Sequence, residues 1–387
     1  MCKVKAKRLG DLINLKRGYD LPVSQRLYGP YPVISSAGIS GYHNEYKVEG
    51  EGVVTGRYGT LGEMYYVNGK YWPHNTALYV ANFKGNNPKY IYYLLSCLGR
   101  IRTSDKSAVP GVNRNELHEM AVPAIEDKVQ QKKIADVLSA LDTKIDCNNR
   151  INAELEAMAK TLYDYWFVQF DFPDANGKPY KSSGGKMVYN STLKREIPLK
   201  WEVWSLKNLV EVVKGNVSPS DIDAITPYVG LEHIGRKTIV LSDWATSDSA
   251  NSDKTAFKKN DILFGKIRPY FHKVVAAPFD GITSTDTIIL RPKKKSFLGL
   301  ALETVFSDEF IESATQSSTG SKMPRADWSV LQHYKIPVPK TDLLEAYQSA
   351  FEGVLKKTYL SSIENKKLSD LRDWLLPMLM NCQVTVN

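Results

Sequence analysis

The sequence has no long hydrophobic run and few cysteines, and both absences narrow the class of protein. No stretch of about 18 apolar residues occurs, so we expect no membrane-spanning helix. The first residues, MCKVKAKRLGDL, have no apolar segment behind their charges, and we expect no signal peptide. The four cysteines, Cys2, Cys97, Cys147 and Cys382, are far apart and lack metal-binding or redox spacing. This usage predicts free thiols in the reducing cytoplasm.

The short motifs of common catalytic sites are also absent. The sequence contains no phosphate-binding glycine loop, no GxSxG, no HExxH and no Asn/Asp-Pro-Pro-aromatic motif of a DNA adenine methyltransferase. Glu126, Asp127 and Lys128, with Asp105 upstream, resemble a nuclease site in which carboxylates hold Mg²⁺. Acidic residues at a helix start also act as caps, and the matching stretch, 340–342, lacks the pattern. We therefore expect no catalytic residue, metal or cofactor on this chain.

An excess of basic residues indicates an anionic partner. The chain has 51 Lys and Arg against 42 Asp and Glu, a formal net charge of +9. Such an excess favours polyanions, with nucleic acid as the first candidate. The length of 387 residues and the 43% hydrophobic content suffice for two domains with real cores.

Three short patterns of the first half recur in the second half in the same order, which predicts an internal duplication. The matching pairs are LGDLINLKRG (9–18) with LKNLVEVVKG (206–215), VVTGRYG (53–59) with ILFGKIR (262–268), and VPGVNRNELHEMAVP (109–123) with MPRADWSVLQHYKIP (323–337). The offset between partners rises from 197 to 209 to 214 residues, as loop insertions would produce.

Each half begins with short strand-like runs broken by Gly, Pro and Asn and ends in a long helical pattern. We therefore predict a mixed α/β (α+β) fold with a pseudo-twofold internal repeat. The expected parts are a globular domain at 1–125, a long helix at 126–168, a surface linker at 169–200, a second globular domain at 201–340 and a second long helix at 341–380.

The apolar residues of the two helical patterns are spaced alternately three and four residues apart, as in a coiled-coil seam. The first seam consists of Ile134, Leu138, Leu141, Ile145, Asn148, Asn152, Leu155, Ala159, Leu162 and Trp166. The second consists of Leu344, Phe351, Leu355, Thr358, Ser362, Asn365, Leu368, Leu371 and Leu375. Both seams become polar midway, and polar seam positions fix register at some cost in stability. We expect the two helices to pair antiparallel within the chain, with their polar stretches meeting; packing on the separate domains, or pairing between chains, is the alternative.

The irregular segments of both halves carry side chains suited to DNA recognition, because base edges and phosphates require amides, hydroxyls and cations. The candidates in the first half are Lys16, Arg17, Arg57, Tyr58, His74, Asn75, Arg100, Arg102, Lys106, Asn113 and Arg114. Those in the second half are Arg236, Lys237, Lys266, Arg268, Tyr270, His272, Thr285, Lys322 and Arg325. For any one of them the alternative is a solvated surface charge. Because the two halves differ at these positions, we expect them to read two different half-sites.

Several strings resemble the specificity subunit of type I restriction-modification systems, and the resemblance covers nearly the whole chain. They are GKIRPYFHKV (265–274), STGSKMPR (318–325), the Ile336-Pro337-Val338-Pro339 exit into a helix, and WFVQFDFP (166–173). The second helix departs from the family pattern, because TDLLEAYQ stands where a Pro-rich step followed by Glu-Gln is typical.

The resemblance implies a non-catalytic, cytoplasmic subunit whose two target-recognition domains, 1–125 and 201–340, each read one part of a bipartite double-stranded DNA target. It implies two methyltransferase subunits that modify adenine N6, and restriction-translocase subunits that cut DNA. S-adenosylmethionine, ATP and Mg²⁺ are then expected on the partners and not on this chain, and no membrane is involved. The alternatives are a specificity subunit of a methylation-only system, a coiled-coil scaffold that does not bind DNA, and a stand-alone nuclease using Glu126 and Lys128.

Overall fold

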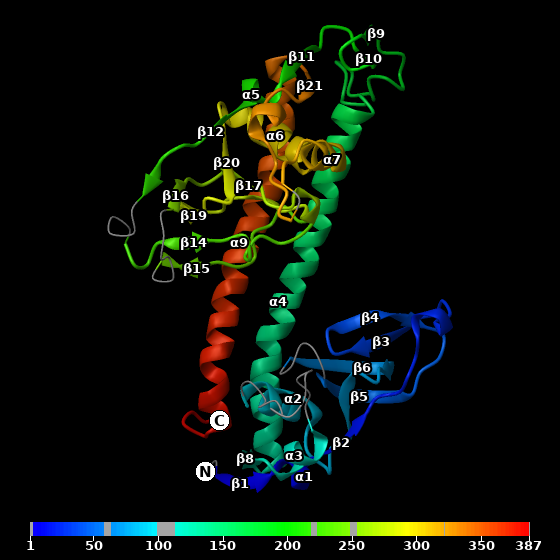
Figure 1. Cartoon of the computed structure of the whole chain (residues 1–387), viewed down its shortest axis with the longest axis vertical. Helices are drawn as coiled ribbons and strands as arrows, with labels where there is room; N and C mark the ends of the chain where they lie inside the picture. The colour runs from blue at the N-terminus through cyan, green and yellow to red at the C-terminus, as the bar shows by residue number, and fades with distance from the viewer. Residues whose placement is uncertain are drawn as a thin grey trace. The chain divides into compact units, whose positions relative to one another are not determined.

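The computed structural model describes residues 3–57, 63–98, 113–217, 223–247, 254–320 and 322–386, and the chain divides into two compact units (Figure 1). Unit 1 consists of Met1–Lys144 and Leu368–Asn387, and unit 2 is Ile145–Lys367. Within the described ranges, no helix is both long enough and apolar enough to cross a bilayer.

Unit 1 contains a six-stranded sheet of order β2-β7-β5-β6-β3-β4 and a separate antiparallel pair, β1 with β8. Its strands are β1 (Val4–Arg8), β2 (Asn14–Arg17), β3 (Tyr31–Ser35), β4 (Gly38–His43), β5 (Val48–Gly56), β6 (Met64–Pro73), β7 (Ala77–Asn82) and β8 (Ala121–Ile125). Its short helices are α1 (Leu9–Leu12), η1 (Val23–Gln25), α2 (Pro88–Cys97) and α3 (Arg114–Glu119).

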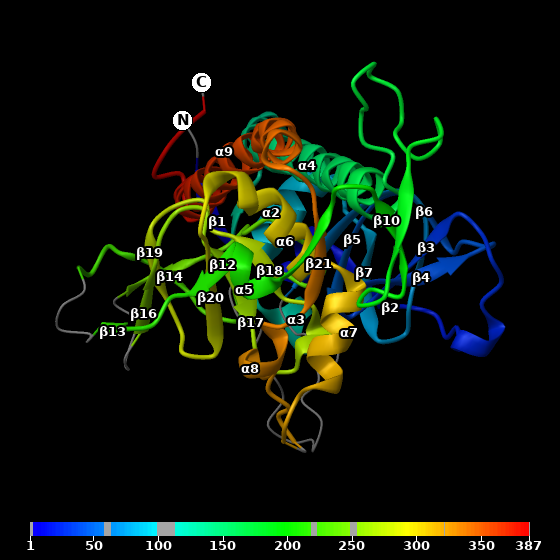
Figure 2. The same ribbon diagram turned by 90° about the horizontal axis from the view of Figure 1, so that it is seen from above.

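Unit 2 contains a four-stranded sheet of order β12-β20-β17-β18 and a five-stranded sheet of order β13-β16-β19-β14-β15 (Figure 2). Its strands are β9 (Met187–Asn190), β10 (Arg195–Pro198), β11 (Glu202–Ser205), β12 (Val210–Val212), β13 (Asn216–Val217), β14 (Pro227–Val229), β15 (Ala245–Thr246), β16 (Lys254–Phe257), β17 (Ile262–Gly265), β18 (Val274–Ala276), β19 (Gly281–Thr283), β20 (Thr287–Pro292) and β21 (Lys335–Val338). Its short helices are α5 (Leu206–Leu209), η5 (Pro269–Phe271), η6 (Lys295–Phe297), α6 (Leu298–Phe306), α7 (Asp308–Gln316) and α8 (Trp328–Leu331).

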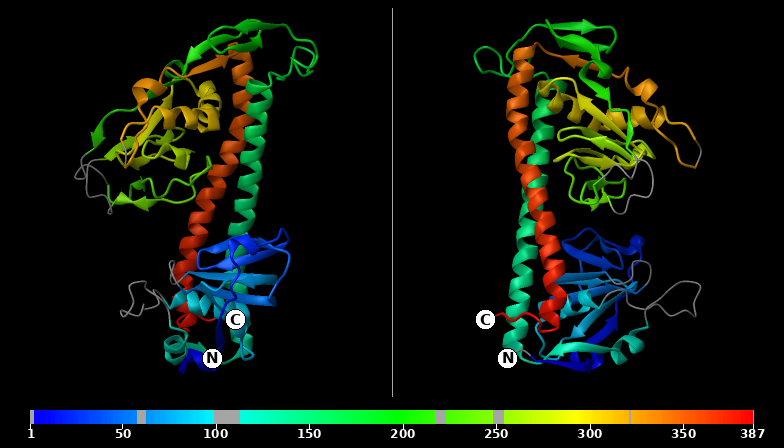
Figure 3. Two further views of the ribbon diagram at one scale, coloured as in Figure 1. Left: turned by 45° about the vertical axis from the view of Figure 1, so that its right-hand side comes forward. Right: turned by 90° about the vertical axis from the view of Figure 1, so that its left-hand side faces the viewer.

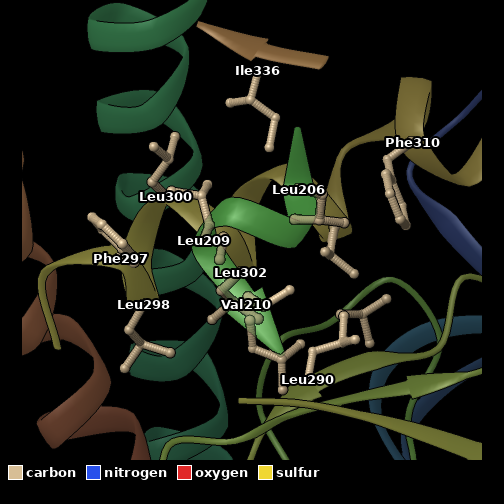
Figure 4. Packing of buried hydrophobic residues seen from close by; sticks show 14 of the residues in the cluster. Leu206, Leu209, Val210, Leu290, Phe297, Leu298, Leu300, Leu302, Phe310 and Ile336 are labelled. Atoms are coloured by element: carbon tan, nitrogen blue, oxygen red, sulfur yellow. The ribbon is translucent and has the colours of Figure 1, made fainter. Parts of the chain in front are cut away.

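The two units repeat one topology, as the sequence duplication predicts. In each, the strand that precedes the aligned one-turn helix pairs antiparallel with the strand before a long helix: β1 with β8, and β11 with β21. A one-turn helix follows, and its aligned leucines, Leu9 with Leu206 and Leu12 with Leu209, are buried. The order β2-β7-β5-β6 of unit 1 then corresponds to β12-β20-β17-β18 of unit 2. Figure 4 shows Leu206 and Leu209 packed among the core residues of unit 2.

Two long helices, α4 (Lys128–Tyr163) and α9 (Thr341–Met380), contribute a segment to each unit. In unit 1, Ile134 and Leu138 of α4 share a buried cluster with Leu379 and Met380 of α9. In unit 2 the two helices lie side by side in both views of Figure 3. A π-helical turn, η2 (Asp164–Val168), follows α4, and Trp166 packs on Tyr347 of α9. The partners run in opposite sequence directions, so the pairing within each unit is antiparallel.

The polar part of the seam forms hydrogen bonds between the helices of unit 2. Asn148 Nδ2 donates to Asn365 Oδ1 (2.8 Å) and to Glu364 Oε2 (2.7 Å), and Asn365 Nδ2 donates to Asn149 Oδ1 (2.8 Å). Asn152 and Ser362 are buried, but Asn152 Oδ1 and Ser362 Oγ have no hydrogen-bond partner among the described residues. A buried amide pair of this kind favours one register, because a shift would leave the amides unpaired.

The remaining seam positions differ in burial. Ile134, Leu138, Ala159, Leu344, Phe351 and Leu355 are buried, whereas Leu141, Ile145, Leu155, Leu162 and Leu375 are partly buried. Leu371 is 42% exposed, so its assignment to the seam is wrong. The neighbouring Arg372 takes the inward position instead, where it pairs with Asp142 at 2.9 Å.

A glutamine near the start of each long helix attaches it to its unit in the same way. The Gln131 amide oxygen accepts from the Asn87 backbone N–H at the start of α2 (3.0 Å), and the Gln348 amide oxygen accepts from the Gly299 N–H at the start of α6 (2.9 Å). Both glutamines are buried. A Cβ at Gly299 would lie 2.9 Å from the Phe351 and Tyr347 rings, so only glycine permits this approach of α6 to α9.

The segment 169–200 is more than the surface linker predicted from its composition. Its middle is exposed and forms the hairpin of β9 and β10. Its ends, however, are buried: Phe170 and Phe172 pack on the Trp201 ring at centroid distances of 5.3 and 5.2 Å, and Ile197 belongs to the same core. The prediction is therefore wrong at both ends, because three isolated apolar residues show no period from which burial could be inferred.

The cysteines differ from one another in state. Cys97 and Cys147 are free thiols, as predicted. Cys382 is disulfide-bonded, so the prediction of a free thiol is wrong at this position. Cys2 lies outside the described residues.

The core of unit 2 contains a carboxyl group, that of Glu303, which has no hydrogen bond or ion pair among the described residues and whose burial the nearby Lys160 charge offsets only in part. Glu303 on α6 is 3% exposed, and burial raises its pKa to about 8. Its pKa in an unfolded chain is near 4.5. Between these two values the folded state holds a proton that the unfolded state releases, so this group lowers stability as the pH rises from about 4.5 to about 8.

We predict that Glu303→Gln stabilises unit 2 at neutral and alkaline pH. At pH 7 the gain should be about 3 kcal/mol, from about 1.4 kcal/mol for each pH unit above the unfolded pKa. Calorimetric melting between pH 4 and pH 9 measures it: the gain should vanish near pH 4 and level off above pH 8. Glu312→Gln, at an exposed position on α7, is the matched control. A pH-independent difference between Glu303→Gln and the wild type would contradict the assignment.

Candidate nucleic-acid interface

Three loops of unit 2 meet on one surface, which we call the three-loop surface: residues 265–272, 283–287, and 318–320 with 322–326. Backbone hydrogen bonds fix them to one another. Lys266 N–H donates to Asp286 O (3.0 Å), and Arg268 N–H donates to Pro324 O (2.7 Å). Ala326 N–H donates to Lys266 O (2.8 Å), and Thr319 and Arg325 exchange two backbone bonds. Loops that are distant in sequence therefore form one rigid platform.

The three-loop surface carries most of the basic residues predicted for DNA contact in the second half. Lys322 and Arg325 are exposed, and Lys266 and Arg268 are partly exposed. Lys266 Nζ donates to Thr285 O (2.5 Å), and an Arg268 guanidinium nitrogen donates to Lys322 O (3.3 Å). These bonds use carbonyl oxygens and do not neutralise the charges of Lys266 and Arg268, whereas Arg325 lies 4.0 Å from the Asp286 carboxylate. Cations held in this way suit phosphate contact.

Two further predicted residues adjoin the same loops. The Arg236 guanidinium lies 4.0 Å from the centre of the Phe271 ring, and that ring also packs on Tyr270, which is 49% exposed. Lys237 N–H donates to His272 O (2.9 Å). Arg268 and His272 both have a left-handed backbone, with φ values of 49° and 53°, so the chain reverses sharply between them.

His272 is buried within unit 2, and the prediction that it contacts DNA is therefore wrong. Its side chain is 5% exposed, and its Nε2 donates to Phe306 O (2.7 Å). Burial lowers its pKa below the usual 6.5, which keeps the ring neutral at pH 7. The left-handed turn directs this side chain inward. The basic residues near His272 in the sequence therefore did not indicate that it is exposed.

Three loops also meet in unit 1, at residues 17–20, 56–57 and 73–77. Tyr19 N–H donates to Pro73 O (2.8 Å), and Arg57 N–H donates to Thr76 O (2.8 Å). Arg57 follows β5 as Lys266 follows β17, which matches their sequence alignment. Arg17 is exposed, and its Nε donates to Asn75 O (3.4 Å).

The amide groups of unit 1 have other partners. The Asn75 amide donates to the Asp20 carboxylate, and Asn113 caps α3 by accepting from Asn115 N–H (2.9 Å). His74 is half-buried, and burial lowers its pKa. To contact a base, Asn75 and Asn113 would therefore have to break a hydrogen bond within the chain. Lys16, Arg17 and Arg114, by contrast, are exposed cations.

Some predicted residues lie outside the described part of the chain, and one basic residue was missed. Tyr58, Arg100, Arg102 and Lys106 belong to the first group. Arg26 was missed; it donates to Ser40 O (2.6 Å) and raises the positive potential at His74. The available sequence signal was a basic residue in a segment that contains Gly and Pro. In the structure, the adjacent Leu27 and Tyr28 are highly exposed.

The nuclease-like residues serve structural roles. Glu126 pairs with Lys5 (2.7 Å) and Lys7, and these bonds lower the pKa of Glu126 to about 2. Asp127 caps α4 by accepting from Val129 N–H (2.8 Å), and Lys128 donates to Asn86 Oδ1. Across the described ranges, no three His, Cys, Asp or Glu side chains are grouped as a metal site would require.

Most of the chain matches known proteins of one kind. The family model described as the type I restriction modification DNA specificity domain matches twice, at residues 1–157 and 198–367. The chain is similar to the type I restriction enzyme MjaIX specificity subunit of Methanocaldococcus jannaschii, with 26% identity over 76% of this chain and 68% of that protein. It is also similar to the EcoDI specificity subunit of Escherichia coli, with 23% identity over 94% of this chain and 83% of that protein.

A solved structure supports the same fold. The S subunit of a type I restriction-modification system from M. genitalium superposes with a TM-score of 0.60 at 16% identity, covering 98% of this chain and 96% of that one.

We predict that Lys322→Ala weakens binding to duplex DNA about equally for all sequences. Its exposed ammonium group has no side-chain partner among the described residues and lies on the three-loop surface. Loss of one phosphate contact should reduce the slope of log K against log salt concentration by about 1. Fluorescence anisotropy over a range of salt concentrations measures this slope.

The matched control is Lys178→Ala. Lys178 is an exposed lysine in segment 169–200, between η2 and the hairpin of β9 and β10. It should bind DNA as the wild type does. Equal slopes for Lys322→Ala and the wild type would exclude Lys322 from the interface.

Proposed function

The chain belongs to the family of type I restriction-modification DNA specificity subunits, and on this premise we propose that it reads a bipartite DNA target with one half-site for each unit. The supporting observation is that one scaffold occurs twice with different residues on its loops. Arg57 in unit 1 and Lys266 in unit 2 occupy the same position after aligned strands. Beside them, Asn75 and Thr76 of unit 1 correspond to Thr285 and Asp286 of unit 2, because Arg57 N–H donates to Thr76 O as Lys266 N–H donates to Asp286 O. Equivalent platforms with different side chains are expected to prefer different base sequences.

We propose that each unit combines two modes of recognition, contact with phosphates and contact with base edges. We propose that the cations of the three-loop surface, Lys266, Arg268, Lys322 and Arg325, neutralise phosphates, and that Thr285, Tyr270 and Arg236 contact base edges. In unit 1, Lys16, Arg17, Arg57 and Arg114 supply the cations. Water-mediated and shape-dependent readout adds to these direct contacts.

The chain is proposed to be the non-catalytic subunit of its complex. Two methyltransferase subunits would bring S-adenosylmethionine and modify adenine N6, and restriction-translocase subunits would bring ATP and Mg²⁺. The structural roles of Glu126, Asp127 and Lys128 support this assignment, because they leave these side chains without a free metal-binding pair. A methylation-only system would use the same chain without the restriction subunits.

We predict that the two units specify the two half-sites independently. Replacing residues 1–125 with the corresponding part of another family member should change one half of the methylated target and leave the other half unchanged. Long-read sequencing of methylated adenines, with the methyltransferase subunit co-expressed, measures the target. A change in both halves would refute independent recognition, and an unchanged target would refute recognition by unit 1.

We further predict that the helices set the spacer between the half-sites. Seven residues inserted after Lys144 in α4 and after Lys367 in α9 preserve the seam period and add roughly 10.5 Å of helix. At 3.4 Å per base pair, the non-specific spacer should lengthen by about three base pairs. The control inserts seven residues into α4 alone, which puts α4 out of register with α9 on one side of the insertion and should destabilise the chain. An unchanged spacer in the double insertion would exclude this role.

A further inference from the structure

The segment between β2 and β3 of unit 1 carries exposed apolar side chains, and we call residues 20–30 the apolar loop. Val23 is 77% exposed, Leu27 is 61% exposed and the Tyr28 side chain is fully exposed (102%). Figure 1 shows this segment in dark blue beside β3 and β4. Single exposed apolar residues are ordinary, but three of them within residues 23–28 form a patch of the kind that marks a binding surface.

Hydrogen bonds and close packing hold the apolar loop in one conformation. Leu27 N–H donates to His43 Nδ1 (3.1 Å), and an Arg26 guanidinium nitrogen donates to Ser40 O on β4 (2.6 Å). A Cβ at Gly29 would lie 2.2 Å from a backbone atom of the residue after β4, so only glycine permits this approach. The loop therefore holds the exposed side chains away from unit 1, where they cannot fold back onto its core.

The apolar loop begins at the loops of unit 1 that carry the candidate DNA contacts. Leu21 and Trp72 share a small buried cluster, and Trp72 Nε1 donates to Tyr19 O (3.2 Å). Tyr19 N–H in turn donates to Pro73 O (2.8 Å). The apolar loop is thus a continuation of the candidate interface and not a separate surface.

The length of β3 gives the reach of the loop beyond those contacts. His74 N–H donates to Ile34 O (2.8 Å) near the end of β3, whereas Tyr28 lies just before its start. Five residues of strand span roughly 13 Å from first to last Cα. At 3.4 Å per base pair, Tyr28 is placed about four base pairs along a duplex from the His74 contacts.

The charges around the apolar loop favour an anionic partner. Residues 12–44 contain three cations, Lys16, Arg17 and Arg26, but only one acidic residue, Asp20, whose carboxylate already accepts a hydrogen bond from an amide. None of the three cations has an ion-pair partner among the described residues. Apolar side chains surrounded by uncompensated cations match nucleic acid, which combines phosphates with apolar base faces.

The chemistry of a duplex determines where these apolar side chains are buried. The backbone of DNA is charged, and the groove edges of the bases are polar apart from the thymine methyl group. The faces of the bases are apolar, but they are covered by stacking. An aromatic ring on a rigid loop is therefore buried most fully between two base pairs, where it unstacks them and kinks the duplex.

We propose that Tyr28, with Leu27 beside it, inserts between two base pairs of the duplex and kinks it at that step. The proposal rests on the proposed function, since unit 1 must hold the duplex. Pyrimidine–purine steps unstack most easily, so the loop selects such a step through its deformability and without a hydrogen bond to a base. The step lies about four base pairs from the bases that the loops around His74 contact.

The first test uses the complex of the full chain with its methyltransferase subunit and a duplex that contains the methylated target. 2-Aminopurine, which fluoresces more strongly when it is unstacked, replaces one base at a time within and beside the half-site of unit 1. Fluorescence should rise on binding at one step only. Tyr28→Ala should abolish this rise and weaken binding about tenfold, as expected for the loss of one stacking contact. Tyr28→Phe should keep both, because the ring is retained.

The second test places a mismatched pair at the responsive step. A mismatch lowers the cost of unstacking, so the wild type should bind this duplex about tenfold more tightly than the matched one, whereas Tyr28→Ala should bind both equally. The matched control is Tyr189→Ala, at an exposed position on β9 of unit 2, which should behave as the wild type does. Because Tyr28 is fully exposed, its substitution should leave the melting temperature unchanged.

Three outcomes separate the loop from the function it rests on. A wild-type complex that prefers its target but shows no responsive step, with Tyr28→Ala binding equally well, would refute insertion. Weaker assembly of Tyr28→Ala with the methyltransferase subunit, with unchanged fluorescence in the complex that does form, would place a protein on the loop and also refute it. A Tyr28-dependent response on duplexes of any sequence, without preference for a bipartite target, would support insertion and count against the proposed function.

Discussion

The pairing of α4 with α9 is the interaction on which both units depend. A helix of 36 or 40 residues with a single apolar stripe is stable in water only when that stripe is covered. In unit 1 the cover for Ile134 and Leu138 comes from Leu379 and Met380, at the far end of the sequence. In unit 2, Ala159 of α4 shares its core with Phe351 and Leu355 of α9. Neither core is complete within one half of the chain, so the duplicated halves must fold together.

The same constraint explains why the two long helices are attached so similarly. Gln131 and Gln348 each satisfy a backbone N–H at the start of a short helix, a group that would otherwise be buried without a partner. Glu156 plays the same role farther along α4, where its carboxylate accepts hydrogen bonds from the backbone N–H groups of Ile239 and Val240. The helices thus provide both apolar surface and hydrogen bonds, which leaves the loops on the opposite side free to vary. A fixed frame with variable loops is the property that sequence recognition requires.

Sequence reasoning reached the elements that repeat and missed those that depend on a single turn. The three-four spacing identifies Ile134, Leu138 and Asn148 as inward positions, and the aligned leucines locate the equivalent strands and helices. The sequence indicated basic residues in the loops around Lys266 and Arg325, but not that these loops contact one another, because contacts between loops produce no periodic pattern in the sequence. His272 shows the limit most clearly. Two left-handed residues reverse the chain within five positions and bury a ring that stands between basic and aromatic neighbours in the sequence.

Two buried polar features of unit 2 show opposite solutions to one physical problem. The amides of Asn148 and Asn365 are paired across the helices, so their desolvation is compensated and their geometry selects a register. The carboxyl group of Glu303 has no such partner among the described residues, and its burial raises its pKa to about 8, so it keeps its proton at neutral pH. A leucine would fill this position without that cost, and a glutamine would keep the shape without the ionisable group. The buried amide pair therefore specifies the structure at little cost, whereas the buried carboxyl group lowers the stability of unit 2 at neutral pH.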